Sequence, residues 1–128
     1  MTIYVSHSRE FDFEKELYEP IRSANFFKNH TFIFPHEEGR EEPYPTKQFF
    51  QSGECDLILA EVSYPSTGQG IELGWADLLN IPIICHHKDG MRPSQSLSLI
   101  SSKLIMYTDT SDLIHDIEGV FRHYETEN

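Results

Sequence analysis

The feature that most constrains the fold of this chain is a stretch near its middle, from Cys55 to Leu79, which reads CDLILAEVSYPSTGQGIELGWADLL. Its first part is a run of apolar residues typical of a strand that is buried on both faces of a parallel sheet. A turn rich in Ser, Pro, Thr and Gly follows, and helical periodicity begins after it. In an open α/β sheet, ligands bind beyond the carboxyl ends of the strands, where the next helix presents free N–H groups. The order of strand, polar turn and helix therefore predicts a binding site here.

The helix of this stretch is expected from about Gly70 to Leu79, with Glu72 in its first turn. The spacing of Ile71, Trp75, Leu78 and Leu79 is typical of a helix face that packs into the core. At a helix start, the dipole and the free N–H groups favour an ionised carboxylate. Such a carboxylate suits nucleophilic attack on an anomeric carbon. The alternative interpretation is an acid that only stabilises the helix start.

The remaining elements alternate between strands and helices along the chain. Strands are expected at 2–6, 31–34, 56–62, 81–87 and 103–107. Helices are expected at 11–27, 46–52 and 70–79, in an ambiguous region at 92–101, and after Thr110 and Ser111, which are expected to cap the last one. Pro20 predicts a kink or a late start in the first helix. This order predicts an α/β fold, a doubly wound five-stranded parallel sheet with the flavodoxin-like order 2-1-3-4-5.

Composition narrows the classes of partner. The 128 residues fit one domain, expected at 1–124 with a tail at 125–128, and the net charge of -11 argues against binding to a nucleic-acid polymer. No leader segment and no apolar run of membrane-spanning length are seen, so a cytoplasmic protein without membrane contact is expected. Cys55 and Cys85 lie in apolar runs and are expected to be reduced core thiols. The seven histidines have no ligand spacing, so neither a metal nor a cofactor is expected.

Two motifs resemble those of a known family. The segment AEVSYPSTGQGIELGWA, from Ala60 to Ala76, resembles the signature of the nucleoside 2-deoxyribosyltransferase superfamily, most closely its 2'-deoxynucleoside 5'-phosphate N-hydrolase branch. The opening IYVSHS, at Ile3 to Ser8, resembles that family's first strand and nucleotide-binding turn. The resemblance implies that Glu72 is the nucleophile on C1' of the sugar and that Tyr4 helps to hold the carboxylate and the sugar. It also implies a homodimer or higher homo-oligomer, with the site near an interface.

The residues before the nucleophile favour the phosphate branch of the family. Transferases that act on free nucleosides resemble one another in an Asp six residues before the nucleophile, where this chain has Ser66. A hydroxyl donates to a phosphate, whereas a carboxylate repels it. The further substrate-binding residues implied by the resemblance or by charge are Ser8, Gly68, Gly70, Ser96 with Ser98 as its alternative, and Arg9 or Arg92. These residues favour a nucleoside monophosphate as substrate.

One position departs from the family pattern. Eight residues before Asp56, where the family has an Asp that contacts the base and assists proton transfer, this chain has Gln48. An amide binds a base edge but does not deliver a proton as a carboxylic acid does. The proton then comes from another group, with Glu38, His36 and Glu61 as candidates, or the base leaves with little help. Phe49 and Phe50, next to it, are either core residues or a stacking surface for the base.

The predicted function is therefore hydrolysis of the N-glycosidic bond of a (deoxy)nucleoside 5'-monophosphate through a glycosyl intermediate on Glu72. Two alternatives stay open. One is a transferase that moves deoxyribose between bases, and the other is a non-catalytic nucleotide sensor or binding module, which the Gln48 departure leaves open. The acidic segment 35–45, with three prolines, is expected to be a loop over the site or a plain solvated connection.

Overall fold

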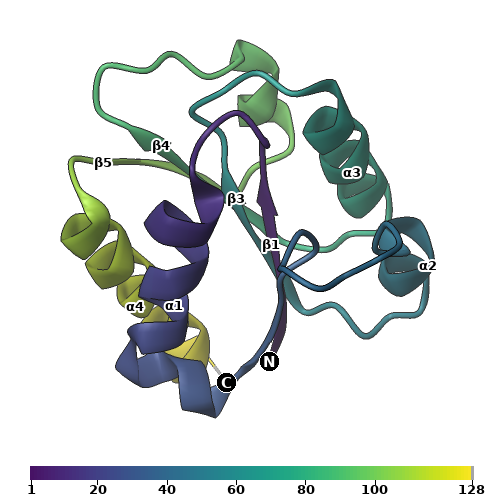
Figure 1. The fold of residues 1–128 in the computed structure, drawn as a ribbon, viewed down its shortest axis with the longest axis horizontal. Helices are drawn as coiled ribbons and strands as arrows, with labels where there is room; N and C mark the ends of the chain where they lie inside the picture. Colours follow the sequence, from purple (N-terminus) through teal and green to yellow (C-terminus); the bar gives the residue numbers. More distant parts are fainter. Residues whose placement is uncertain (128) are drawn as a thin grey trace.

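The structure is a computed structural model and describes residues 1–127. Its centre is a five-stranded parallel sheet in the order β2-β1-β3-β4-β5, as the sequence predicted. The strands are β1 (Thr2–His7), β2 (Thr31–Ile33), β3 (Leu57–Glu61), β4 (Ile83–Lys88) and β5 (Lys103–Tyr107). In Figure 1, α1 and α4 lie on one side of the sheet, and α2 and α3 lie on the other.

The helical segments vary in length and type. They are η1 (Glu14–Tyr18), α1 (Glu19–Ser23), η2 (Asn25–Asn29), α2 (Thr46–Gln51), α3 (Thr67–Leu78), η3 (Gln95–Leu99) and α4 (Thr110–Glu127). The first predicted helix is thus a π turn, an α turn and a 3₁₀ turn in succession. Pro20 lies in the first turn of α1, directly after the π turn, so the interruption expected near it is a change of helix type and not a late start.

Strand alternation divides the core into two clusters, one on each side of the sheet. Ile3 and Val5 face the α1 and α4 side, whereas Tyr4 between them faces the α2 and α3 side. Cys55 and Cys85 are buried in the second cluster as free thiols, which confirms the expectation for both. Because Tyr4 belongs to this cluster, the α2 and α3 side is the one on which β1 presents a functional side chain.

Helix α3 begins earlier than the sequence analysis predicted. Its first residue is Thr67 rather than Gly70, because Ser66 is the N-cap and its Oγ accepts a hydrogen bond from the backbone N–H of Gln69 at 3.3 Å. Glu72 consequently lies in the second turn, and the first turn carries no acid. The expectation of an acid at the helix start was wrong.

The core face of α3 was also predicted incorrectly. Ile71, Leu78 and Leu79 are exposed by 51%, 82% and 43%. The residues of α3 that face the sheet are Gln69, Leu73 and Ala76, while Trp75 is half-buried against the second cluster. An apolar stripe at helical spacing therefore remains uncovered on this chain.

The last helix has a different cap from the expected one. Thr110 and Ser111 are already helical, and the Asp109 carboxylate accepts the N–H of Asp112 at 2.8 Å. Of the tail expected at 125–128, the residues up to Glu127 continue α4, and residue 128 lies outside the described residues. No helix within residues 1–127 has both the length and the apolar character needed to cross a membrane.

Candidate functional site

Glu72 faces a cavity of about 430 Å³ between α3 and α2. The lining comes from α3 on one side and from α2 with the loop before it on the other: Tyr44, Pro45, Thr46, Lys47, Gln48, Gly68, Ile71, Glu72 and Trp75. Gly68 and Glu72 are one helical turn apart, so they lie on the same flank of α3. The structure thus brings together three residues that the sequence singled out, namely Gln48, Gly68 and Glu72.

The charge state of Glu72 differs from the prediction. Burial raises the pKa of its carboxyl to about 7, and a hydrogen bond from Tyr4 acts in the opposite direction. The favourable field of a helix start fades beyond the first turn, and Glu72 lies in the second, so desolvation dominates. The expectation that the helix start favours an ionised Glu72 was therefore wrong, since this carboxyl is only partly ionised at neutral pH.

Tyr4 is the β1 residue next to this carboxyl. It is fully buried, with its ring edge-to-face against Phe50 at 5.0 Å between centroids. Burial, followed by the charge of Glu72, raises the pKa of its phenol, so Tyr4 keeps its proton and can donate it in a hydrogen bond. The second contact of its hydroxyl is Thr46 Oγ1, 2.8 Å away.

Thr46 was not anticipated by the sequence analysis, although it lies in the cavity lining and is buried. A threonine at the first position of a short helix gives no pattern that separates it from an ordinary helix-start residue. Its place two residues before Gln48, in a segment already assigned to the site, was the one available signal.

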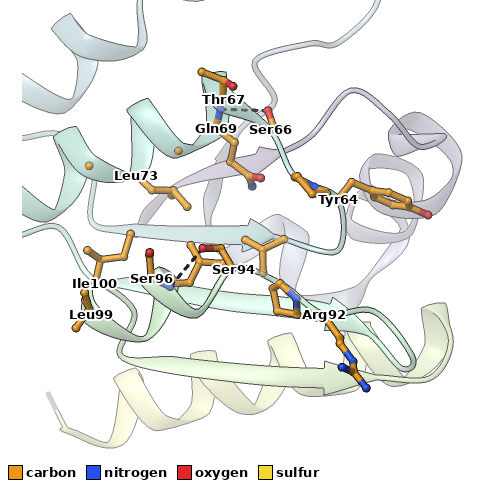
Figure 2. A pocket seen from close by; sticks show the side chains of 16 residues that line it. Tyr64, Ser66, Thr67, Gln69, Leu73, Arg92, Ser94, Ser96, Leu99 and Ile100 are labelled. Atoms are coloured by element: carbon orange, nitrogen blue, oxygen red, sulfur yellow. Dashed lines mark hydrogen bonds between the residues drawn. The ribbon is translucent and has the colours of Figure 1, made fainter.

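The predicted phosphate-binding residues divide between different places. Ser66, Gly70, Arg92 and Ser96 line a second cavity of about 690 Å³, shown in Figure 2, on the flank of α3 away from Glu72. The two cavities share no lining residue among the 127 described. The Arg92 side chain in Figure 2 extends away from the two serines. Within one chain, the structure therefore does not place Ser96 beside Glu72.

Ser8 and Arg9 line neither of these cavities. Ser8 is buried and its Oγ accepts the backbone N–H of Glu10 at 3.1 Å. Arg9 is exposed and borders a smaller polar cavity that also includes His36 and Arg40. Ser98, the alternative to Ser96, is exposed, and its hydroxyl donates to the Gln95 carbonyl at 2.8 Å.

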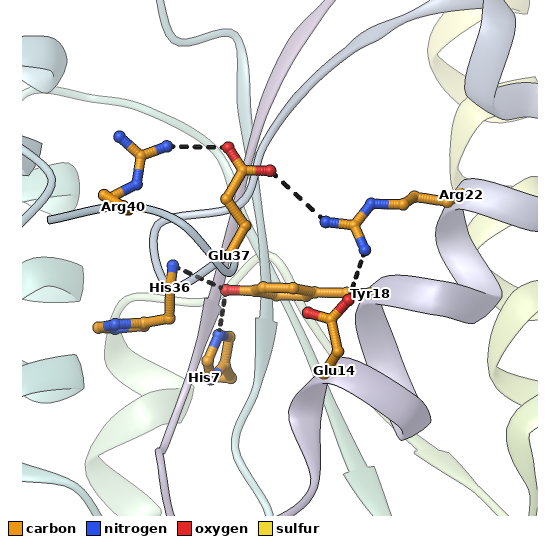
Figure 3. Close-up of polar contacts among 7 residues, drawn as sticks. All are labelled: His7, Glu14, Tyr18, Arg22, His36, Glu37 and Arg40. Atoms are coloured by element: carbon orange, nitrogen blue, oxygen red, sulfur yellow. Dashed lines mark hydrogen bonds and ion pairs between the residues drawn. The ribbon is translucent and has the colours of Figure 1, made fainter.

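The turn that carries Ser8 is held by a buried polar chain, shown in Figure 3. A carbonyl oxygen only accepts, so His7 Nδ1–H donates to Ser8 O at 2.8 Å, and His7 Nε2 accepts from the Tyr18 hydroxyl at 2.6 Å. The Tyr18 oxygen in turn accepts the backbone N–H of His36 at 3.1 Å. Burial lowers the pKa of His7 to about 4, which keeps this imidazole neutral. The chain fixes the end of β1 against the loop after β2.

None of the three candidate proton donors reaches the Glu72 cavity. Glu38 is exposed on its loop, and His36 lies in the polar cavity with Arg9. The Glu61 carboxylate is buried and accepts hydrogen bonds from Ser63 and Tyr107. Phe50 is buried and Phe49 packs against the second core cluster, while neither lines the cavity, which fits the core interpretation.

Comparison with known proteins supports the resemblance seen in the motifs. Over 63 residues the chain is 38% identical to the protein named "Putative 2'-deoxynucleoside 5'-phosphate N-hydrolase 1" of Syntrophotalea carbinolica. The resemblance to the nucleoside deoxyribosyltransferase-like family is thereby confirmed. The match covers 47% of this chain and spans less than half of the relative, 44% of its length. No protein-family model matches the chain.

Solved structures share the fold at low sequence identity. The CMP N-glycosidase BcmB of Clostridium botulinum has a TM-score of 0.63 and 19% identity, over 92% of this chain and 99% of that one. A conserved protein of Enterococcus faecalis V583 has a TM-score of 0.58 and 16% identity, over 93% of this chain and 98% of that one. These likenesses extend the similarity in fold to almost the whole chain.

Proposed function

We propose that this protein is a nucleotide N-glycosidase that hydrolyses the N-glycosidic bond of a (deoxy)nucleoside 5'-monophosphate. The observation that carries the proposal is the position of Glu72, a half-buried carboxyl that faces a cavity and interacts with the Tyr4 hydroxyl. The sequence match to an N-hydrolase of deoxynucleoside phosphates supports the substrate class.

In the proposed reaction Glu72 acts as the nucleophile. A carboxylate oxygen forms a bond to C1' of the sugar while the bond from C1' to the base nitrogen breaks, and its electron pair leaves with the base, which takes up a proton. Water then attacks C1', the glycosyl ester breaks, and the sugar phosphate and free carboxylate are released. Because only the ionised form attacks, a pKa of about 7 makes the first step faster as the pH rises through neutrality.

The phosphate is proposed to bind at the start of α3. Gly68 lies in the same cavity as Glu72 and has no side chain to shield its backbone N–H from a ligand. Backbone N–H groups at a helix start bind anions, and they lie about one turn from Glu72. Ser66, the N-cap of the same helix, stands next to these groups.

We further propose a homo-oligomer in which Ser96 serves the site of a second copy. Ser96 and Glu72 lie on different flanks of α3, so one chain does not bring them to the same substrate. Exposed apolar side chains are the usual mark of a contact surface. Ile71 in the lining of the Glu72 cavity, Leu99 in the lining of the second cavity and Leu78 further along α3 are such residues. Light scattering with Leu78→Glu tests this part, since a charge in a contact between copies is expected to give monomers.

A second candidate function is a nucleotide-binding module without catalysis. Gln48 supports it, because an amide borders the Glu72 cavity at the position where the resemblance expects a carboxylic acid. A Gln48→Asp variant that gains activity would favour a decayed enzyme over a dedicated binding module.

The test is release of free base from a panel of ribo- and deoxyribonucleoside monophosphates. We expect release by the natural protein and none by Glu72→Gln, which keeps the shape of the side chain and removes the charge. Glu54→Gln, at an exposed acid outside the cavity, is the matched control and should behave as the natural protein. Adding a second free base separates hydrolysis from transfer, because a transferase forms a new nucleotide. Binding without base release in every variant would favour the binding module.

A further inference from the structure

The buried hydroxyl of Thr46 contacts Tyr4, the residue next to Glu72. Thr46, the first residue of α2, is only 6% exposed, and its Oγ1 lies 2.8 Å from the Tyr4 hydroxyl. Its other polar neighbour, the Tyr44 carbonyl, is 3.4 Å away, at the long limit for a hydrogen bond. The contact with Tyr4 is therefore the stronger interaction of this side chain.

Either hydroxyl can be the donor in this contact, and a proton count favours one direction. Tyr4 has a single hydroxyl proton, and the Glu72 carboxylate, whose pKa the Tyr4 hydroxyl lowers, is the strongest acceptor for it. With that proton directed to Glu72, the Tyr4 oxygen is left as an acceptor, so we assign the Thr46 hydroxyl as the donor in the 2.8 Å contact. This assignment gives a chain directed from Thr46 to Tyr4 to Glu72.

We infer that Thr46 is a positioning residue for the nucleophile, since it fixes the Tyr4 hydroxyl in the orientation that donates to the Glu72 carboxyl. This inference rests on the proposed function, in which Glu72 attacks the sugar. It assigns a role to a residue that neither the motifs nor the family resemblance singles out. Linked hydrogen bonds polarise one another, so losing the first donor weakens the second bond.

The consequence is a dependence of Glu72 ionisation on Thr46. The titratable groups that face Glu72 from the elements around it are Tyr4 on β1, Tyr44 in the loop and Lys47 on α2. The Lys47 ammonium lies over the Trp75 ring, 5.6 Å from its centre. Loss of the Thr46 hydroxyl leaves these groups in place and removes only the support of the Tyr4 bond. The protonated form of Glu72 should then persist to higher pH.

The experiment is a ¹³C NMR titration of the Glu72 carboxyl in the free protein, assigned with Glu72→Gln. In Thr46→Val, which has the same shape without a hydroxyl, the midpoint is expected to rise by about 0.5 pH unit or more. Thr46→Ser should keep the natural midpoint. Tyr4→Phe should raise it further, and Thr46→Val added to Tyr4→Phe should change nothing more.

An unchanged midpoint in Thr46→Val, or equal effects of Thr46→Val with and without Tyr4, would overturn the inference. Should Thr46→Val not fold, Thr46→Ala carries the same expectation. The titration needs no substrate, so its outcome is independent of the proposed function. The pH profile of base release provides the functional readout, and its acidic limb should shift with the NMR midpoint. An absence of base release from the natural protein would remove the proposed function and leave the titration result intact.

Discussion

Two glutamates stand on either side of the turn between β3 and α3, and their surroundings are opposite. The Glu61 carboxylate is 2% exposed and accepts from the Ser63 N–H at 2.7 Å, from the Ser63 hydroxyl at 2.8 Å and from the Tyr107 hydroxyl. Glu72 borders a cavity, and the Tyr4 hydroxyl is the one group that lowers the pKa of its carboxyl. A buried carboxylate whose oxygens accept several hydrogen bonds stabilises a fold. A carboxylate with few hydrogen-bond donors beside a cavity is available to react with a ligand.

The bonds around Glu61 also connect the elements. Its carbonyl accepts from Gln69 Nε2 at 2.9 Å, which ties the first turn of α3 to β3. The Ser63 hydroxyl accepts the Lys88 N–H at 2.8 Å, and Tyr107 comes from β5. This side of the turn therefore holds the start of α3 in place, while the Glu72 side leaves room for a ligand.

The largest expected effect is a loss of activity when Glu72, and not Glu61, loses its charge. Glu72→Gln should lower base release by about a thousandfold or more, because the proposed nucleophile is lost. Its thermal midpoint should not fall. An active Glu72→Gln protein would show that the nucleophile is another residue, and the contrast in role between Glu61 and Glu72 would then fail.

The next largest effect is on stability, where substitution of Glu61 should cost more than substitution of Glu72. Glu61→Ala leaves the donors of Ser63 and Tyr107 without their acceptor inside the protein and should lower the free energy of unfolding by about 3 kcal/mol. Glu72→Ala should cost far less, since one donor loses its partner beside an open cavity. Urea unfolding of both variants measures the difference, and equal losses would contradict the contrast between the two sites.

A smaller effect follows from the raised pKa of Glu72. Its pKa of about 7 in the folded protein lies above the ordinary value of 4.5, so the folded state binds the proton more tightly than the unfolded state does. This acid therefore costs no stability below pH 4.5, and its cost grows as the pH rises to 7 and stays constant above it. Glu72→Gln should raise the free energy of unfolding by up to about 2 kcal/mol at pH 8 and by almost nothing at pH 4.

Urea unfolding at the two pH values checks this prediction. Glu54→Gln, the exposed control, should show no comparable dependence on pH. A gain for Glu72→Gln that is larger at pH 4 than at pH 8 would show that the assigned direction of the Glu72 shift is wrong.

The smallest effect concerns the helix that carries Glu72. Ser66→Ala removes the N-cap of α3 and should lower the free energy of unfolding by about 1 kcal/mol. Thr67→Ala, at the neighbouring exposed residue, is the matched control and should have little effect. If Ser66 also binds the phosphate, its loss should raise the KM for a nucleoside monophosphate more than that for the free nucleoside. An equal change for both substrates would limit Ser66 to capping.

The sequence predicted the sheet well, because strands buried on both faces give unbroken apolar runs bounded by turn residues. The bounds of β5 and the order of the five strands were predicted correctly. The motif also placed Glu72, Gly68 and Gln48 in one site, and these three residues line one cavity.

The sequence did not predict what depends on side-chain surroundings. Helical spacing does not separate a face that packs on the sheet from a face left for another contact, so Ile71 and Leu78 were assigned to the core. Ser66 could have been recognised as a helix cap from its residue type, and the start of α3 then follows. The pKa of Glu72 and the role of Thr46 depend on burial and on a contact between distant residues, which no local pattern contains.

The most direct test of the central claim is intact-mass and peptide analysis of the protein quenched during turnover of a nucleoside monophosphate. The proposed mechanism predicts a transient adduct on the peptide that contains Glu72, with the mass of the sugar phosphate less one water, and no adduct on Glu72→Gln. Base release without any adduct, or an adduct on another residue, would contradict it.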